Sequence, residues 1–398
     1  MSLEFDYYSL GDLVKIKYGK NQKKVQDDEN GQYPIFGTGG LMGYSIEYLY
    51  DKPSVLIGRK GSIEKVRYIE EPFWTVDTLF YTEVNEKVVI PKFLYYVISL
   101  IDLSRYNEGT SIPSLRTETL NRLDLPIPDL DYQNRVLSVL SKIDKKIEIN
   151  GKINKNLEQL MKCIFEDWFV NFNYSEDISF KSSELGEIPS NWNVKKLSDV
   201  LITLESGKRP KGGISDIEDG IPSIGAENIL GLGKFNYSKN KLISHEFFST
   251  LKKGVIQDKD VLLYKDGAQL GRKSLFMKGF PFDICCINEH VFRLQTNDEI
   301  NQFYLYLWLD QEVMTNEIIN LNSNSAQPGI NQNDVKSLPI LVPELKIISK
   351  FNKIISPMMN QIFDNALEIN KLTKLRDTLL PKLMSGEIDV SKINCDLE

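Results

Sequence analysis

The sequence predicts an α+β protein in which two repeated domains of strands and short helices are joined by two long, antiparallel helices related by a pseudo-twofold axis. Three observations support this fold. A proline-containing segment occurs twice, glycine-rich stretches with strand-length apolar runs precede each copy, and a heptad pattern follows each copy. The chain has 398 residues, which is more than one hydrophobic core usually organises.

The repeated segment is the clearest of these signals. GTSIPSLRTETLNRLDLPIPDLD covers residues 109–131, and NSAQPGINQNDVKSLPILVPELK covers residues 324–346. Pro113 and Pro328 hold the same place, 215 residues apart. Upstream, SLGDLVKIKYGK is matched by KLSDVLITLESGK, and VLIGRKGS by VLLYKDGA, at smaller offsets. The repetition predicts two copies of one architecture, with insertions in the early part of the second copy.

The early part of each half predicts antiparallel strands with a few helices, because Gly-bounded runs of Tyr, Phe, Val and Ile have strand length. TSIPSLRTETL predicts a turn that enters a short helix, with Pro113 near its first turn. LDLPIP and LPILVP are predicted to be extended, because a residue before proline avoids the helical region.

A long helix is predicted after each extended segment. Apolar residues and asparagines recur at alternating spacings of four and three, which is the period of a coiled-coil seam. The predicted seam includes Ile143, Ile147, Asn150, Leu157, Met358, Ile362, Asn365 and Leu372. Asn150 and Asn365 occupy equivalent positions, where a polar residue usually fixes the register. Pro357 is expected to kink the second helix or to begin its main part, and Pro381 to end it.

These patterns divide the chain into six segments. They are a first strand-rich domain (residues 1–128), a first long helix (129–172), a linker (173–188), a second strand-rich domain (189–343), a second long helix (344–386) and a tail (387–398).

The search for catalytic or cofactor motifs gives only near misses. GTGGLMG departs from the GxGxxG spacing, and GAQLGRKS has one residue too few between its glycines for a phosphate loop. His245 and His290 have no second ligand at metal-binding spacing. We therefore expect no cofactor, no metal site and no catalytic site within the chain.

The remaining composition indicates an ordinary cytoplasmic protein. No apolar run approaches the roughly 18 residues of a membrane span. Cys163, Cys285, Cys286 and Cys395 form no CxxC pair, which favours reduced thiols. The formal net charge of −7 argues weakly against a protein that coats nucleic acid, yet basic residues cluster at matching places in the two halves.

The order of motifs closely resembles the DNA-specificity subunits of type I restriction–modification systems over nearly the whole chain. The motifs are, in order, IPSL and LPIP, IFEDWFVNF, LGEIPSNWNVKKL, LPILVP and LLPKLMSGEI. One departure is PDLDYQ, where the family more often has an acidic pair before the glutamine, although Gln133 itself is retained.

The resemblance implies a function in DNA recognition. Residues 1–128 and 189–343 would be target-recognition domains that each read half of a bipartite site in double-stranded DNA. The long helices would set the spacing and bind two methyltransferase subunits, while partner subunits, including the restriction and translocase subunits, would carry adenine methylation and ATP-driven cleavage. Candidate DNA contacts are Lys20, Lys23, Lys24, Arg59, Lys60, Lys208, Arg209, Lys211, Lys265, Gln269 and Arg272.

Other interpretations of the sequence stay open at this point. The basic residues could belong to ordinary solvated loops, since exposed lysines are common on any surface. The chain could be a tandem-repeat scaffold, an enzyme on a duplicated fold, or the specificity subunit of a related methylation-only or type II system.

Overall fold

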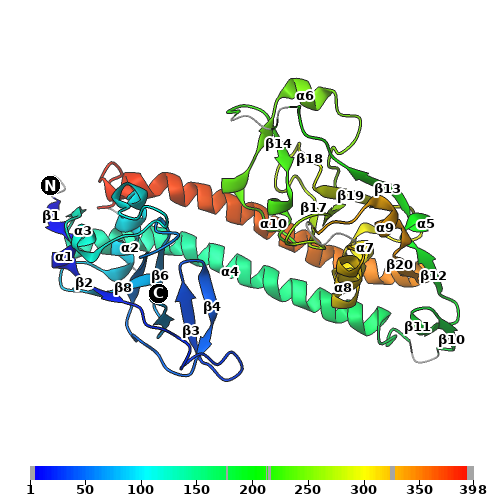
Figure 1. Ribbon diagram of the computed structural model, residues 1–398, viewed down its shortest axis with the longest axis horizontal. Coiled ribbons are helices and arrows are strands. Elements are labelled where there is room, and N and C mark those ends of the chain that lie inside the picture. The colour runs from blue at the N-terminus through cyan, green and yellow to red at the C-terminus, as the bar shows by residue number, and fades with distance from the viewer. Residues whose placement is uncertain (1–4, 176–177, 212, 214–216, 323–327, 392–398) are drawn as a thin grey trace. The chain divides into compact units, whose positions relative to one another are not determined.

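The computed structural model describes residues 5–175, 178–211, 213, 217–322 and 328–391. Cys395 and residues 324–327 of the second repeated segment lie outside this range. The chain divides into two compact units: unit 1 combines residues 1–145 with 372–398, and unit 2 spans residues 146–371. Each unit contains part of both long helices, α4 (Leu130–Phe169) and α10 (Leu345–Met384). The α+β fold with two strand-rich domains and two long packed helices is confirmed (Figure 1).

Unit 1 contains a four-stranded antiparallel sheet in the order β2-β8-β5-β6 and a three-stranded sheet in the order β4-β3-β7. A short strand pair, β1 with β9, stands apart from both sheets. The strands are β1 (Asp6–Ser9), β2 (Val14–Tyr18), β3 (Tyr33–Gly37), β4 (Gly40–Ser45), β5 (Ser54–Gly58), β6 (Val66–Ile69), β7 (Trp74–Thr75), β8 (Leu79–Val84) and β9 (Asp124–Ile127). β3 and β7 pair in parallel, whereas the sequence predicted antiparallel strands. Between them the chain forms β4, β5 and β6, and β7 then runs beside β3 in the same direction.

The short helices of unit 1 pack beside its strands, and α2 lies against β5 and β6 of the four-stranded sheet. They are α1 (Leu10–Leu13), α2 (Pro91–Ser99), the 3-10 helix η1 (Leu103–Tyr106) and α3 (Thr117–Asn121). Phe93 and Leu94 of α2 are fully buried in one core with Val136 and Leu140 of α4. Pro113 lies before α3 and not in its first turn. Asp124–Ile127 of LDLPIP form β9, so the predicted extended conformation of these residues is confirmed.

Unit 2 repeats this topology strand by strand. Its sheets have the orders β13-β19-β16-β17 and β15-β14-β18, β14 and β18 are parallel, and β12 pairs with β20. The strands are β10 (Phe180–Ser183), β11 (Gly186–Pro189), β12 (Asn193–Lys196), β13 (Leu201–Ser206), β14 (Ile221–Ile224), β15 (Leu242–Ile243), β16 (Asp260–Tyr264), β17 (Lys273–Phe276), β18 (Cys286–Ile287), β19 (Val291–Thr296) and β20 (Pro339–Val342). β10 and β11 form a hairpin within the segment that the sequence analysis treats as a linker.

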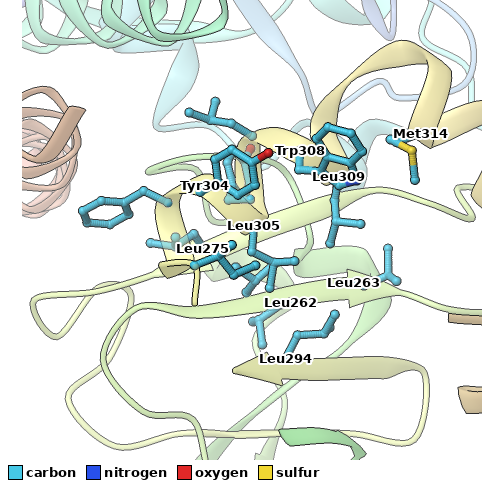
Figure 2. Close-up of a cluster of buried hydrophobic side chains, with 14 of the residues drawn as sticks. Leu262, Leu263, Leu275, Leu294, Tyr304, Leu305, Trp308, Leu309 and Met314 are labelled. Atoms are coloured by element: carbon cyan, nitrogen blue, oxygen red, sulfur yellow. The ribbon is translucent and has the colours of Figure 1, made fainter. Parts of the chain in front are cut away.

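The core of unit 2 lies between its four-stranded sheet, α7 and the long helices. The helices are α5 (Leu197–Val200), η2 (Ala226–Asn228), η3 (Tyr237–Lys239), α6 (His245–Ser249), α7 (Gln302–Asp310), α8 (Glu312–Asn320) and α9 (Gln332–Ser337). Figure 2 shows Leu305 of α7 above Leu262 and Leu294 of the sheet, and all three side chains are fully buried. Burying such side chains stabilises the fold by about 1.5–3 kcal/mol each.

The two long helices are antiparallel in both units (Figure 1). In unit 1, Tyr132 Oη of α4 donates a hydrogen bond to the carbonyl oxygen of Leu383 in α10, at 2.8 Å. In unit 2, Asn154 Nδ2 of α4 donates to the carbonyl oxygen of Ile362 in α10, at 3.1 Å. A later residue of α4 thus meets an earlier residue of α10, which is antiparallel packing.

α10 continues through both of its prolines. From the sequence, Pro381 was expected to end this helix, but the helix extends to Met384. A proline inside a helix removes one backbone hydrogen bond and costs about 3 kcal/mol. Leu380, Leu383 and Met384 are buried in the core of unit 1, and this burial offsets the cost. Within the described residues, no helix combines the length and apolarity that crossing a membrane requires.

Candidate nucleic-acid interface

Three loops of unit 1 meet beyond the ends of its strands. We call residues 19–24, 59–61 and 76–78 loop cluster 1. The backbone N–H of Lys20 donates to the carbonyl of Thr75 at 2.8 Å, and the N–H of Arg59 donates to the carbonyl of Thr78 at 2.8 Å. The indole N–H of Trp74 donates to the carbonyl of Lys20 at 2.9 Å. These bonds hold the two loops that carry basic residues, 19–24 and 59–61, together at the 76–78 loop.

Unit 2 builds the same arrangement, which we call loop cluster 2: residues 207–211, 265–272 and 288–290. The N–H of Lys265 donates to the carbonyl of His290 at 3.1 Å, as Arg59 does to Thr78 in unit 1. Gly207 passes close to another strand end, because a Cβ at that position would lie 1.7 Å from the carbonyl oxygen of Ile287. In unit 1, a Cβ at Gly19 would lie 2.0 Å from the carbonyl oxygen of Val76.

The repeated proline segment is part of both loop clusters. The carbonyl of Pro113 accepts a hydrogen bond from the N–H of Gly61 at 2.9 Å. The carbonyl of Pro328 accepts from the N–H of Gly267 at 2.8 Å. The segment that occurs twice in the sequence therefore binds the corresponding basic loop in each unit.

The predicted basic residues of unit 1 gather in loop cluster 1. Lys20, Lys23, Lys24 and Lys60 are exposed, and none of them forms an ion pair with the part of the chain that the structure describes. Arg59 is half-buried. Its guanidinium lies 5.0 Å from the ring centre of Tyr18, and its Nη1 donates to the carbonyl of Asp77 at 2.9 Å.

The predicted residues of unit 2 divide into two groups. Lys208, Lys211, Gln269 and Arg272 are exposed, and their side chains form no ion pair within the described ranges. Arg209 and Lys265 are paired with acids. Nε of Arg209 lies 2.8 Å from Oε1 of Glu289, and Nζ of Lys265 lies 3.4 Å from Oδ2 of Asp266 and 5.3 Å from the ring centre of Phe292.

Loop cluster 2 also contains acids and a histidine that were not among the predicted site residues. His290 lies between two carboxylates: its Nδ1 is 2.5 Å from Oδ1 of Asp266, and its Nε2 is 3.2 Å from Oε1 of Glu289. Burial would raise the pKa of the nearby Glu227 carboxyl, but a hydrogen bond from Lys241 and the charge of His290 hold that pKa below its usual value. In the sequence, only the repeat points to His290, because His290 occupies the position that Thr78 has in unit 1.

Three cavities in the structure lie away from the loop clusters. One of about 600 Å³ is lined by the end of α4 with α7 and α8, including Lys162 and Asp310. Cavities of about 400 Å³ and 470 Å³ lie in unit 1 and share Ile101 and Asp124. Among the described residues, no three His, Cys, Asp or Glu side chains come together in a way that could hold a metal ion.

Comparison with known proteins identifies the family. A family model described as the type I restriction modification DNA specificity domain matches residues 3–159 and 189–377. The chain belongs to the family of type I restriction–modification DNA-specificity subunits. The two matched stretches each contain one strand-rich domain with its loop cluster and much of one long helix.

Several specificity subunits are similar to this chain over most of its length. The MjaIX specificity subunit of Methanocaldococcus jannaschii is 24% identical, with 98% of this chain and 95% of the relative covered. The HindI specificity subunit of Haemophilus influenzae is 25% identical, with 79% and 81% covered. The crystal structure of the S subunit from M. genitalium has a TM-score of 0.59 and 18% identity, with 96% of both chains covered, which supports the same fold.

The long helices of this specificity subunit contain two polar layers in unit 2. Asn365 Nδ2 donates to Oδ1 of Asn154 at 2.8 Å, and Asn150 Nδ2 donates to Oε2 of Glu368 at 2.7 Å. All three asparagines are buried. Asn150 and Asn365, equivalent in the repeat, thus have different partners.

The other predicted seam residues differ in burial. Ile362 is fully buried, and the half-buried seam residues are Ile143, Ile147, Leu157, Met358 and Leu372.

Proposed function

We propose that this specificity subunit recognises a bipartite site in double-stranded DNA, and that each target-recognition domain reads one half through its own loop cluster. The observation that carries the proposal is the repetition of one basic loop arrangement, with two equivalent backbone bonds, in two units of a family member. Lysine and arginine side chains on loops suit phosphate contacts, and Arg, Lys, Asn or Gln suit base edges in a groove.

The long helices would separate the two domains and bind two methyltransferase subunits. α4 and α10 each contain 40 residues, so each is about 60 Å long at roughly 1.5 Å per residue. Half-sites read from one face of DNA lie about 34–36 Å apart. Helices of this length are therefore sufficient to hold two recognition domains about one DNA turn apart.

The chain would have no catalytic activity of its own. Methylation of adenine and ATP-driven cleavage would belong to the methyltransferase and the restriction–translocase subunits, as in other members of the family. The three cavities described above contain none of the loop-cluster residues, and they contribute nothing to this proposal.

A domain exchange tests the proposal. Residues 1–128 are replaced by the matching domain of a related specificity subunit, and methylated adenines are mapped genome-wide in cells that also contain the methyltransferase subunit. We expect one half of the recognised site to change while the other half stays the same. Exchange of residues 189–343 is the matched control and should change only the other half. A change in both halves from a single exchange would contradict separate reading.

A further inference from the structure

We propose that Arg59 and Arg209 are the residues that read bases, and that Glu289 is a positioning residue that fixes the guanidinium of Arg209. The inference rests on the proposed function, and it separates base-reading residues from phosphate contacts within the two loop clusters. It starts from an observation common to both units: in each cluster one arginine is held by the protein, while most lysines are not.

Arg209 is held through one edge of its guanidinium. Its Nε meets Oε1 of Glu289 at 2.8 Å, which leaves both Nη groups available to a ligand. The side chain is 38% exposed, so those groups are accessible to solvent. Guanine presents O6 and N7 in the major groove, and two parallel N–H donors from one guanidinium match that pair. The free edge of Arg209 has this geometry.

Glu289 is itself held by a second contact. Oε1 of its carboxylate also faces Nε2 of His290 at 3.2 Å, and Nδ1 of His290 faces Oδ1 of Asp266 at 2.5 Å. The second carboxylate oxygen, Oε2, is shielded from solvent and so cannot meet DNA directly. The carboxylate therefore acts on Arg209, and the chain of contacts through His290 and Asp266 restricts its movement.

Arg59 is held by different contacts in unit 1. Its guanidinium stacks near the Tyr18 ring at 5.0 Å, and Nη1 donates to the carbonyl of Asp77 at 2.9 Å. Nη2 and the second N–H of Nη1 remain as a pair of donors. A cation over an aromatic face and a hydrogen bond to a carbonyl together restrict the orientation of the guanidinium.

Most lysines of the loop clusters, in contrast to these two arginines, are not held by other described residues. Lys20, Lys23, Lys24, Lys60 and Lys208 are exposed, and within the described residues they have no ion-pair partner. A mobile single charge suits a phosphate, whose contact carries no sequence information. A restricted guanidinium suits a base edge, because its conformational entropy is already lost before DNA binds. Arg209 is also neutralised by Glu289, so it should release few counterions from DNA.

Three substitutions and one control test the proposal. Arg209→Lys and Arg59→Lys keep the charge and remove the paired donors, and Glu289→Gln keeps the shape and removes the charge. Lys208→Ala is the matched control beside Arg209. Each full-length variant, assembled with its methyltransferase subunits, is used to select duplexes from a pool of random sequence. Affinity for the selected wild-type duplex is then measured across a range of salt concentrations.

We expect Arg209→Lys to lower discrimination at one base pair of the second half-site by roughly 5- to 160-fold, with the first half-site and the salt slope unchanged. Glu289→Gln should relax the same base pair, which a residue with only a structural role would not do. Arg59→Lys should relax one base pair of the first half-site only. Lys208→Ala should leave the selected sequence unchanged and lower the slope of log affinity against log salt by about 0.9.

The proposal is overturned if Arg209→Lys and Arg59→Lys select the wild-type sequence with wild-type discrimination, or if Lys208→Ala alters the sequence selected. A failure of the proposed function looks different, because the wild-type assembly would then select no sequence from the pool at all.

Discussion

Lys273 offers a quantitative test of the packing of unit 2. This lysine lies on β17 with only 4% of its surface exposed, and its Nζ donates a hydrogen bond to Oγ1 of Thr315. Burial lowers the pKa of Lys273 to about 8; the carboxylate of Asp310 opposes that change, and the charge of Lys162 adds to it. We predict that Lys273→Met stabilises unit 2 at neutral pH.

The size of the effect follows from the pKa of Lys273 in the folded and unfolded chain. The pKa falls from 10.5 to about 8 on folding, and each unit is worth about 1.4 kcal/mol, so burial of the charge costs about 3 kcal/mol at pH 7. Between pH 8 and 10.5 the unfolded chain binds more protons, so wild-type stability gains from this group as the pH rises. At pH 9.5 the remaining cost is about 1 kcal/mol, and the advantage of methionine should shrink by roughly 2 kcal/mol.

Thr315 would lose little in this variant. Its Oγ1 also donates to the carbonyl of Gln311 at 2.8 Å, so the hydroxyl keeps its donor bond when the lysine is removed. The loss is one accepted hydrogen bond, which is worth about 1 kcal/mol at most in such a setting. The net gain at pH 7 is therefore still expected to be about 2 kcal/mol.

Urea unfolding followed by tryptophan fluorescence measures this difference. Trp168, Trp192 and Trp308 belong to unit 2 and Trp74 belongs to unit 1, so the signal reports mainly on unit 2. Lys239→Met, at an exposed lysine, is the control and should change stability by less than about 0.5 kcal/mol at either pH. An advantage of Lys273→Met that is the same at pH 7 and 9.5, or a destabilised variant at both, would refute the reasoning.

Two further predictions concern a buried ion pair and the long helices. Arg293→Met should destabilise unit 2 by about 3–5 kcal/mol, because it leaves the fully buried carboxylate of Asp260 without its ion partner, and adding Asp260→Asn should recover most of that loss in the same urea experiment. Inserting seven residues after Lys145 and seven after Lys371, where the chain passes between units, keeps the heptad phase and lengthens each helix by about 10 Å. A methylation map should then show a spacer longer by up to roughly three base pairs, with both half-sites unchanged; an unchanged spacer in an active variant would show that the helices do not set it.

The long helices and the repeat could be predicted from sequence because periodic patterns extend over many residues. The seam period and the constant offset of 215 both depend on lengths that do not vary between the halves. Details that depend on a partner from elsewhere could not be predicted. Asn365 meets Asn154 and not Asn150, since the register of an antiparallel pair follows from packing across the whole seam. Pro381 stays inside α10 because buried neighbours outweigh one missing hydrogen bond.

The basic residues of the candidate site could be predicted from the sequence, but the side chains that contact them could not. Arg209 and Glu289 are 80 positions apart, and nothing in their spacing indicates that they meet. His290 follows Cys285 and Cys286 closely in the sequence, but nothing in that spacing indicates a charged network with Asp266 and Arg209. Both acids and the histidine come from loops, where the repeat has drifted most, and where folding alone brings the side chains together.

The positions of the insertions explain how the loop clusters can differ while their framework stays constant. The connection from β14 to β16 contains η2, η3, β15 and α6, whereas the connection from β3 to β5 contains only β4. The bonds from Gly61 to Pro113 and from Gly267 to Pro328 are nevertheless the same. The added residues therefore enter upstream of a loop that remains bonded to the proline segment in both units. If the proposed function holds, differences in recognition between the two halves are expected to depend on the side chains and insertions at the clusters.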